Sequence, residues 1–354
     1  MYNTEIEKIT QNLIKEEKID EIKNSLAIKK AVELILQDEV VAFPTETVYG
    51  LGANALKAKA VNKIFKAKGR PSDNPLIAHI ASDKQLPELI AGDIPETVKK
   101  LIKRFWPGPL TIIFNKSKLV PDITTAGLNT VAVRMPSHPV ALALIQKVNL
   151  PLAAPSANSS GFPSPTKAEH VYNDLNGKIP LIVDGGICNI GVESTVVEIK
   201  DKAVNILRPG GITKEMIKAV LGVNYQVETV NQVEVKTPKS PGMKYKHYAP
   251  NTPLWIVKKD NINRVLKQKE TNNKKTLLLL SHETLNSLDL DTVNASVKDI
   301  GSIKDLGYIA KQLFNLLREA DQNDFELILI EEVPNKEIGE AVMNRLKKAA
   351  VKII

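Results

Sequence analysis

Short apolar segments alternate with amphipathic helical patterns along the first two-thirds of the chain. Five segments rich in β-branched and aliphatic residues are expected to form strands: Val40–Phe43, Leu76–Ile80, Leu110–Phe114, Val131–Val133 and Ser194–Ile199. Helical patterns lie between them, at Ile28–Gln37, Ala60–Ala67, Pro95–Arg104, Pro139–Val148 and Thr166–Leu175. Alternating strands and helices are typical of α/β proteins, in which helices cover an open sheet. The sequence therefore predicts the α/β class.

A second, smaller α/β unit is expected after a linker. Residues 224–250 carry no apolar periodicity and include the basic, turn-rich run SPGMKYKHYAP, Ser240–Pro250. Beyond this run, strands are predicted at Pro253–Val257, Thr276–Ser281 and Phe325–Glu331, and helices at Leu306–Asp321 and Glu337–Val351. A chain of 354 residues is long enough for two cores. The predicted organisation is a lead-in over residues 1–27, a main domain over 28–222, a linker over 223–251 and a second domain over 252–354.

Composition and charge indicate an ordinary globular protein, with 43% hydrophobic and 25% charged residues. Cys188 is the only cysteine, which excludes an internal disulfide and a cysteine-based zinc site and suits a reducing cytoplasm. Charged residues interrupt every apolar run near the N-terminus, so we expect an amphipathic helix or a frayed lead-in there, and neither a signal peptide nor a membrane span.

The run PTETVYGLGANAL, Pro44–Leu56, follows the first predicted strand. Gly50, Gly52 and Ala55 satisfy the G-x-G-x-x-G/A pattern, but six residues separate them from the strand and no acidic residue ends a second strand, so a dinucleotide site is not favoured. The segment Thr45 to Thr47 has two readings of equal weight: a ligand-contacting loop at the carboxyl end of a strand, or a turn held by threonine hydroxyls.

Two further segments predict a pocket for a phosphate-bearing ligand. Lys68 and Arg70 stand just before Pro71 and a polar loop, where fixed cations suit a polyphosphate; the alternative is a solvated helix end stabilised by its dipole. The segment APSANSSG, Ala154–Gly161, offers hydroxyl and amide donors from Ser156 and Asn158.

Three more segments place polar residues at strand ends. Arg134 follows an apolar strand, so it requires either an acidic partner or a ligand carboxylate. His79 lies within an apolar strand, where a structural role is commoner than a catalytic one. Ser194 lies in GVESTVVEI, and Arg208 in ILRPGGIT.

Familiar nucleotide-binding and hydrolase motifs are absent from the sequence. It contains no G-x-x-x-x-G-K-[ST] loop, kinase signature, nucleophile elbow or H-E-x-x-H site. The five histidines are too scattered to suggest a metal cage, so we predict no resident metal site and expect Mg²⁺ to arrive with phosphates.

These blocks, in this order, resemble the threonylcarbamoyl-AMP synthase family, the YrdC-domain enzymes of tRNA N6-threonylcarbamoyladenosine synthesis. The resemblance runs from Ile28 to Gly222 and continues through SPGMKYKHYAP to GEAVMNRLKKAA, Gly339–Ala350, as in the family's two-domain form. It implies a YrdC-like twisted open sheet with flanking helices, and a Rossmann-like α/β domain at the C-terminus.

The resemblance also implies a reaction. L-Threonine, bicarbonate and ATP would give L-threonylcarbamoyladenylate and pyrophosphate, so the chain would be a nucleotidyltransferase that binds ATP with Mg²⁺. A separate tRNA threonylcarbamoyl transferase complex would use the product. We expect a cytoplasmic protein without membrane contact, for which contact with RNA is a further expectation.

The resemblance assigns roles to residues by their position in the motifs. The implied catalytic residues are Lys68, Arg70, Ser156 and Asn158. The implied ATP-binding residues are Arg70, Asn74, Thr130, Ser156, Ser164, Arg208 and Tyr245, the last as part of a lid formed by the linker. The implied threonine-binding residues are Thr47, His79, Arg134, Ala154 and Ser194, with Thr45 as a close alternative to Thr47.

The competing hypothesis is a non-catalytic module that binds double-stranded RNA or tRNA. The basic pI of about 9.2 and the lysine-rich linker motivate it. Against it, aromatic residues make up only 5% of the chain and are not interleaved with the basic runs as stacking platforms would be.

Overall fold

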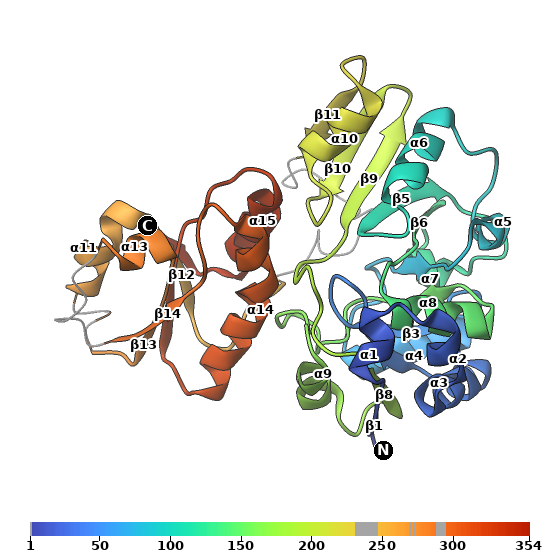
Figure 1. Cartoon of the computed structure of the whole chain (residues 1–354), viewed down its shortest axis with the longest axis horizontal. Helices are drawn as coiled ribbons and strands as arrows, with labels where there is room; N and C mark the ends of the chain where they lie inside the picture. The colour runs from blue at the N-terminus through green and yellow to red at the C-terminus, as the bar shows by residue number, and fades with distance from the viewer. Residues whose placement is uncertain (1, 231–246, 269–270, 272, 288–294) are drawn as a thin grey trace. The chain divides into compact units, whose positions relative to one another are not determined.

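The chain divides into two compact units, which we describe separately. The computed structural model describes residues 2–230, 247–268, 271, 273–287 and 295–354. Unit 1 comprises the described residues within Met1–Ser160, Ser164–Asn189 and Glu193–Tyr245, and unit 2 those within Gly161–Pro163, Ile190–Val192 and Lys246–Ile354. Both are α/β, so the predicted fold class is confirmed (Figure 1).

Unit 1 is built on one mixed sheet, which has eleven strands among the described residues. The strand order is β1-β8-β2-β3-β7-β4-β6-β5-β9-β10-β11. The strands are β1 Glu5–Lys8, β2 Val41–Phe43, β3 Gly50–Asn54, β4 Ile77–His79, β5 Leu110–Asn115, β6 Thr130–Arg134, β7 Leu152–Ala153, β8 Leu181–Asp184, β9 Thr195–Lys200, β10 Ala203–Arg208 and β11 Gln226–Thr229. All five strands predicted in this part of the chain are present.

The helices of unit 1 pack apolar side chains onto the sheet. They are α1 Gln11–Lys15, α2 Ile19–Asn24, α3 Leu26–Leu36, α4 Ala58–Lys68, α5 Leu86–Leu89, α6 Glu96–Phe105, α7 Asp122–Thr125, α8 Pro139–Val148, α9 Ala168–Leu175 and α10 Lys214–Leu221, with a short 3₁₀ turn, η1, at Asp83–Gln85. The five predicted helices are found within two residues of their expected bounds.

Helix α4 shows how the sequence positions a functional side chain. It buries Ala60, Ile64 and Phe65 and ends at Gly69, whose φ of 61° is left-handed. Glycine adopts this conformation without steric cost, so the helix stops directly after Lys68 and the chain turns sharply toward Arg70.

Two expectations for the ends of this domain are wrong. Glu5–Lys8, expected in a helix or a frayed lead-in, forms β1 and pairs in parallel with β8. Gln226–Thr229, expected in the linker, forms β11 and pairs in parallel with β10. Each is an edge strand with at most one buried side chain, so neither carries the apolar alternation that predicts a strand.

Within its described residues, unit 2 has a five-stranded, all-parallel sheet of order β14-β13-β15-β12-β16. Its strands are β12 Leu254–Val257, β13 Thr276–Leu280, β14 Ala295–Asp299, β15 Leu327–Glu331 and β16 Lys352–Ile353. Its helices are α11 Ile262–Leu266, preceded by the 3₁₀ turn η3 Lys259–Asn261, α13 His282–Leu285, α14 Leu306–Gln322 and α15 Ile338–Ala349. Helices α11 and α13 cover one face of the sheet and α14 and α15 the other (Figure 1). Both predicted helices and all three predicted strands are present.

Candidate active site

Three neighbouring strands bring the predicted threonine-binding residues into one row. His79 in β4 lies opposite Arg134 in β6, and Arg134 lies opposite Thr111 in β5. Residues directly opposite on adjacent strands point to the same face of a sheet. The hydroxyl of Thr111 in turn lies 2.8 Å from the hydroxyl of Ser194, which precedes β9. The sheet register thus joins His79, Arg134 and Ser194, which are far apart in sequence.

The loop after β2 completes this cluster through Thr47. The Thr45 hydroxyl donates to the Val48 carbonyl oxygen at 2.6 Å and accepts from the Val48 backbone N–H. Because the single Thr45 proton is used in this way, the Thr47 hydroxyl is the donor in their 2.7 Å contact. Thr47 Oγ1 also accepts from Arg134 Nη1 at 3.0 Å. Thr45 therefore holds the turn, while Thr47 contacts the arginine.

Arg134 is buried in an ion pair with Glu46. Its Nη2 lies 2.7 Å from Glu46 Oε1, and its Nε donates to the Gly108 carbonyl oxygen at 3.3 Å. The other carboxylate oxygen, Glu46 Oε2, accepts from the Ser137 backbone N–H at 3.1 Å. The expectation that Arg134 has either an acidic partner or a ligand carboxylate is met by Glu46 in this structure.

His79 is uncharged in this cluster. Burial, followed by the positive charge of Arg134, lowers its pKa to about 3. Its Nδ1 lies 3.1 Å from the Ile77 carbonyl oxygen, which can only accept, so Nδ1 carries a proton. A neutral imidazole beside a guanidinium adds polarity to the site without adding charge.

Ser194 and Arg208 are held together at the start of β9 and the end of β10. Arg208 donates from Nε to the Ser194 carbonyl oxygen and from Nη2 to the Ser194 hydroxyl, both at 3.1 Å. The structure therefore groups Arg208, which the motif position assigned to the nucleotide, with the predicted threonine-binding residues.

Lys68 lies beneath the loop that follows β7. Its ammonium donates to the carbonyl oxygens of Ser156, at 2.5 Å, and Asn158, and lies 3.3 Å from Asn158 Oδ1. The Ser156 hydroxyl donates to Asn158 Oδ1 at 2.5 Å. Three of the four residues predicted to be catalytic are thus in direct contact. The cation at the end of α4 and the loop form one cluster.

Arg70 and Asn74 lie on the turn between α4 and β4. Arg70 Nη2 lies 3.4 Å from the carbonyl oxygens of Asn74 and Pro75. The Asn74 side chain is only 1% exposed, yet neither its oxygen nor its nitrogen has a hydrogen-bond partner among the described residues. A buried amide without partners is costly, and such groups mark places where a ligand supplies the missing bonds.

The remaining predicted residues differ in their contacts. Ser164 is buried and donates to the carboxylate of Glu193. Ala154 donates its backbone N–H to the Ile77 carbonyl oxygen at 2.9 Å. Thr130 begins β6, at the opposite end of that strand from Arg134, and none of the contacts recorded for the described residues joins it to another predicted residue. Tyr245 lies outside the described residues.

The two halves of the site lie at opposite ends of strand β4. Asn74 precedes this strand, and Ala154 bonds to its first residue, whereas His79 is its last residue. A strand of three residues spans roughly 7 Å between its first and last Cα. The Ile77 end of β4 thus lies beside Ala154, whose loop continues to Ser156 and Asn158, and the His79 end lies in the Arg134 cluster.

Sequence reasoning missed two acidic partners and a hydroxyl in this region. The sequence places Glu46 in a polar loop and gives no signal for Thr111 or Glu193, yet each of the three contacts a predicted residue. The unpaired arginine at a strand end was the available signal for Glu46. The contacts of Thr111 with Ser194 and of Glu193 with Ser164 depend on the three-dimensional arrangement of the strands and loops, which the sequence does not show.

The glycines of the G-x-G-x-x-A pattern have a packing role. Gly50 and Gly52 lie inside β3, which pairs antiparallel with β2 and β7, and not in a strand-to-helix turn. A Cβ on Gly52 would lie 2.5 Å from a ring carbon of Phe43. These glycines allow close approach of a buried aromatic ring, which agrees with the sequence argument against a dinucleotide site.

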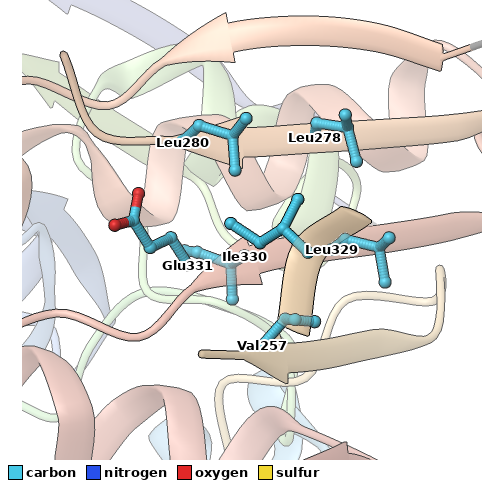
Figure 2. A pocket seen from close by; sticks show the side chains of 7 residues that line it. Val257, Leu278, Leu280, Leu329, Ile330 and Glu331 are labelled. Atoms are coloured by element: carbon cyan, nitrogen blue, oxygen red, sulfur yellow. The ribbon is translucent and has the colours of Figure 1, made fainter. Parts of the chain in front are cut away.

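Other regions of the described chain offer less chemistry. Unit 2 contains a shallow apolar hollow, too narrow to admit a water molecule, lined by Val257, Ile262, Leu278, Leu280, Leu329, Ile330 and Glu331 (Figure 2). Its one charged group, Glu331, is occupied: the carboxylate accepts from the Ser281 N–H at 2.8 Å and the Thr284 hydroxyl at 2.6 Å. No three His, Cys, Asp or Glu side chains of the described residues are grouped to hold a metal ion. Within the same residues, no helix combines the length and apolar character needed to cross a membrane.

Comparisons with known proteins agree with this geometry. Residues 33–210 match the family described as "Telomere recombination", and residues 212–351 match "Threonylcarbamoyl-AMP synthase, C-terminal domain". The chain is 50% identical over 330 residues to the threonylcarbamoyl-AMP synthase of Bacillus subtilis, covering 92% of this chain and 94% of that protein. It is 43% identical over 360 residues to the corresponding protein of Schizosaccharomyces pombe, covering 92% and 88%.

A solved structure is similar over the whole length of the chain. The crystal structure of Pyrococcus abyssi Sua5 complexed with L-threonine has a TM-score of 0.84 and 43% sequence identity, and the alignment covers 100% of both chains. The likeness thus includes the sheet of unit 1 and the parallel sheet of unit 2.

Proposed function

This chain belongs to the threonylcarbamoyl-AMP synthase family, and on that premise we propose that it joins L-threonine, bicarbonate and ATP into L-threonylcarbamoyladenylate, with release of pyrophosphate. The observation that carries the proposal is the row of His79, Arg134 and Thr111 beside Thr47 and Ser194. This row offers a guanidinium for a carboxylate and neutral polar groups for an amine and a hydroxyl, which is the chemistry of threonine. The complex of the P. abyssi relative with L-threonine supports this assignment.

The second half of the site supports a nucleotide. Lys68 supplies a fixed positive charge, and the loop of Ser156 and Asn158 adds neutral donors close to it. The buried amide of Asn74 makes no side-chain hydrogen bond among the described residues, so its NH₂ group can donate to a ligand and its oxygen can accept from one. Together these groups suit a polyphosphate or a nucleotide held beside them.

The proposed chemistry needs no nucleophilic side chain. The threonine amine attacks the carbon of bicarbonate, and loss of water leaves a carbamate. An oxygen of the carbamate then attacks the α-phosphorus of ATP, and the bond to pyrophosphate breaks, so the products are threonylcarbamoyladenylate, pyrophosphate and water. The protein's part is to hold the carbamate in line with the α-phosphorus and to offset the charge that develops there.

Each half of the site has a role in this sequence. Arg134, with Thr47 and Ser194 near it, would orient threonine so that its amine points toward the amino end of β4. Lys68 and Arg70 would hold the phosphates and stabilise charge on the leaving pyrophosphate. ATP would arrive as its magnesium complex, so Mg²⁺ belongs to the substrate.

Three finer points extend the proposal. The product would be passed to a separate tRNA threonylcarbamoyl transferase complex for N6-threonylcarbamoyladenosine synthesis, in the cytoplasm. A linker lid carrying Tyr245 would protect the mixed anhydride from water. Direct contact with RNA is not required by this scheme.

The test measures pyrophosphate release and the adenylate product by mass spectrometry with the purified full chain. The proposal requires release that depends on ATP, L-threonine and bicarbonate together, and ¹³C from labelled bicarbonate in the product. Release that continues at the same rate without threonine, or without bicarbonate, would refute it. Arg134→Ala is the matched variant, because loss of its charge should weaken threonine binding more than ATP binding and so lower threonine-dependent release.

A further inference from the structure

The Glu46 carboxylate is a buried negative charge at the centre of the threonine half of the site. Only 6% of the residue is exposed, and Arg134, its partner in the ion pair, is 3% exposed. Burying a carboxylate is expensive unless it is paired and hydrogen-bonded, and Glu46 is both. One oxygen contacts Arg134 Nη2, and the other accepts from the backbone N–H of Ser137. The carboxylate is therefore held from two sides.

Arg134 can bind a ligand carboxylate without releasing Glu46. A guanidinium has five N–H donors, and Arg134 uses two of them in hydrogen bonds to Gly108 and Thr47, while its Nη2 lies 2.7 Å from Glu46 Oε1 as an ion pair. Among the contacts of the described residues, each terminal nitrogen therefore keeps at least one N–H donor for a ligand. A carboxylate that uses these donors would share the guanidinium with Glu46, which its second bond to Ser137 keeps in place.

The charges around the row then distinguish a carboxylate ligand that also carries an ammonium from one that does not. Around the row, the arginines are Arg134 and Arg208, and the carboxylates are Glu46, which pairs with Arg134, and Glu193, which precedes Ser194 and accepts from the Ser164 hydroxyl. His79 is neutral. The ammonium of an amino acid lies only two bonds from its own carboxyl carbon, so it must sit close to the guanidinium. Without Glu46, this ammonium would lie beside the Arg134 guanidinium with no carboxylate paired to that guanidinium.

We propose that Glu46 makes the pocket selective for an amino acid zwitterion over the hydroxy acid anion of the same shape. This inference rests on the proposed function, because it takes threonine as the ligand. The carboxylate offsets the charge of Arg134 that an ammonium would otherwise meet, and a ligand without an amine gains nothing from it. Glu46 is thus a specificity-determining residue that acts through the electrostatics of the site.

The test compares L-threonine with (R)-3-hydroxybutanoate, which is threonine without its amine. Isothermal titration calorimetry on the full chain gives both dissociation constants for the wild type and for Glu46→Gln. We expect the variant to bind threonine at least tenfold more weakly while its affinity for 3-hydroxybutanoate changes less than threefold. Equal weakening of both ligands would show that Glu46 only holds Arg134 in place, and unchanged threonine affinity would show no role; either result overturns the proposal.

Two controls keep the test decisive. Glu39→Gln removes a carboxylate from another ion pair of unit 1, the 2.5 Å contact with Lys63, and should change neither constant. The wild type supplies a measurement that does not depend on how well the variant folds: it must bind threonine at least tenfold more tightly than 3-hydroxybutanoate, and equal affinities overturn the inference. A wild type that binds no threonine refutes the proposed function itself, and this inference with it.

Discussion

His79 and Arg134 lie opposite each other in the parallel β4–β6 ladder, and the arginine helps to keep the histidine uncharged. The pairing is fixed by the backbone hydrogen bonds of the β4–β6 ladder, so the backbones of His79 and Arg134 cannot move apart without breaking the sheet. Burial contributes most to the lowered pKa of His79, and the guanidinium of Arg134 adds to it. His79 therefore remains uncharged throughout the neutral pH range.

The first prediction concerns stability at acid pH. The pKa of His79 is about 3 in the folded chain and 6.5 when unperturbed, so between these values the unfolded chain binds one more proton. Stability must fall as the pH falls below about 6.5, by up to about 1.4 kcal/mol per pH unit for this residue. His79→Gln removes this contribution. Between pH 6.5 and 5, the free energy of unfolding of the wild type should therefore fall by about 2 kcal/mol more than that of the variant.

Urea unfolding followed by tryptophan fluorescence measures this effect. The chain has two tryptophans, Trp106 in unit 1 and Trp255 in unit 2, so a Trp255→Phe background reports on unit 1 alone. The exposed His282 of unit 2 provides the control, since His282→Gln should leave the Trp106 transition unchanged at every pH. A wild type and His79→Gln with parallel pH profiles would contradict the assigned protonation state.

The second prediction separates two lysines of helix α4. Lys68→Ala removes the buried ammonium that bonds to Ser156 and Asn158, and we expect kcat for pyrophosphate release to fall by roughly 100-fold or more. Lys63→Ala removes a lysine from the same helix that pairs with Glu39, and kcat should stay within about threefold of wild type. Steady-state kinetics of both variants make the comparison, and similar losses would assign the effect to the helix and not to Lys68.

The third prediction uses two buried asparagines. Asn74 has no side-chain partner among the described residues, so Asn74→Ala should lower the affinity for ATP about tenfold with little change in Tm. Asn54 Oδ1 accepts from the Leu56 backbone N–H at 3.0 Å, so Asn54→Ala should lower Tm by about 2–4 °C and leave ATP binding intact. Thermal melts with and without ATP test both variants, and the reverse pattern would remove Asn74 from the nucleotide site.

The fourth prediction concerns the buried ion pair. Arg134→Gln leaves Glu46 buried without its partner and should cost about 3–5 kcal/mol of stability, whereas Arg134→Gln combined with Glu46→Gln should cost less. Both variants should lose affinity for threonine far more than for ATP. The Trp106 transition and the two binding constants check this, and a double variant less stable than the single one would argue against a direct pair.

Five central strands of the unit 1 sheet and the three central strands of the unit 2 sheet could be predicted from the sequence, because burial on both faces leaves unbroken apolar runs; β7, β8 and β10 are also central and were not predicted. Leu278 and Leu329 lie in such runs, and both are buried. Edge strands could not be predicted: in β1 every side chain is at least partly exposed, and β16 has only two residues, both exposed. Strand β3 could not be predicted for another reason: its glycines are typical of a turn, and only the structure shows that Gly52 packs against the ring of Phe43.

The chemical nature of the site residues could be inferred from the sequence more readily than their partners. An arginine at a strand end requires an anion, which is a local argument, but the choice of Glu46 depends on a loop 88 residues earlier in the chain. Similarly, Thr45 and Thr47 are equivalent in sequence and differ only because the Thr45 hydroxyl closes a turn onto Val48. The distinction between them is set by hydrogen-bond geometry, which composition and spacing do not encode.

The row of His79, Arg134 and Thr111 has a consequence for the energetics of recognition. The three residues lie side by side on three adjacent strands, β4, β6 and β5, so the spacing of their backbone positions is already fixed before a ligand enters. Little conformational entropy remains to be lost in this part of the pocket when it is filled. Binding in this part of the pocket therefore requires little ordering of the protein, and the selectivity of the pocket depends on how well the shape and charge of the ligand match these side chains.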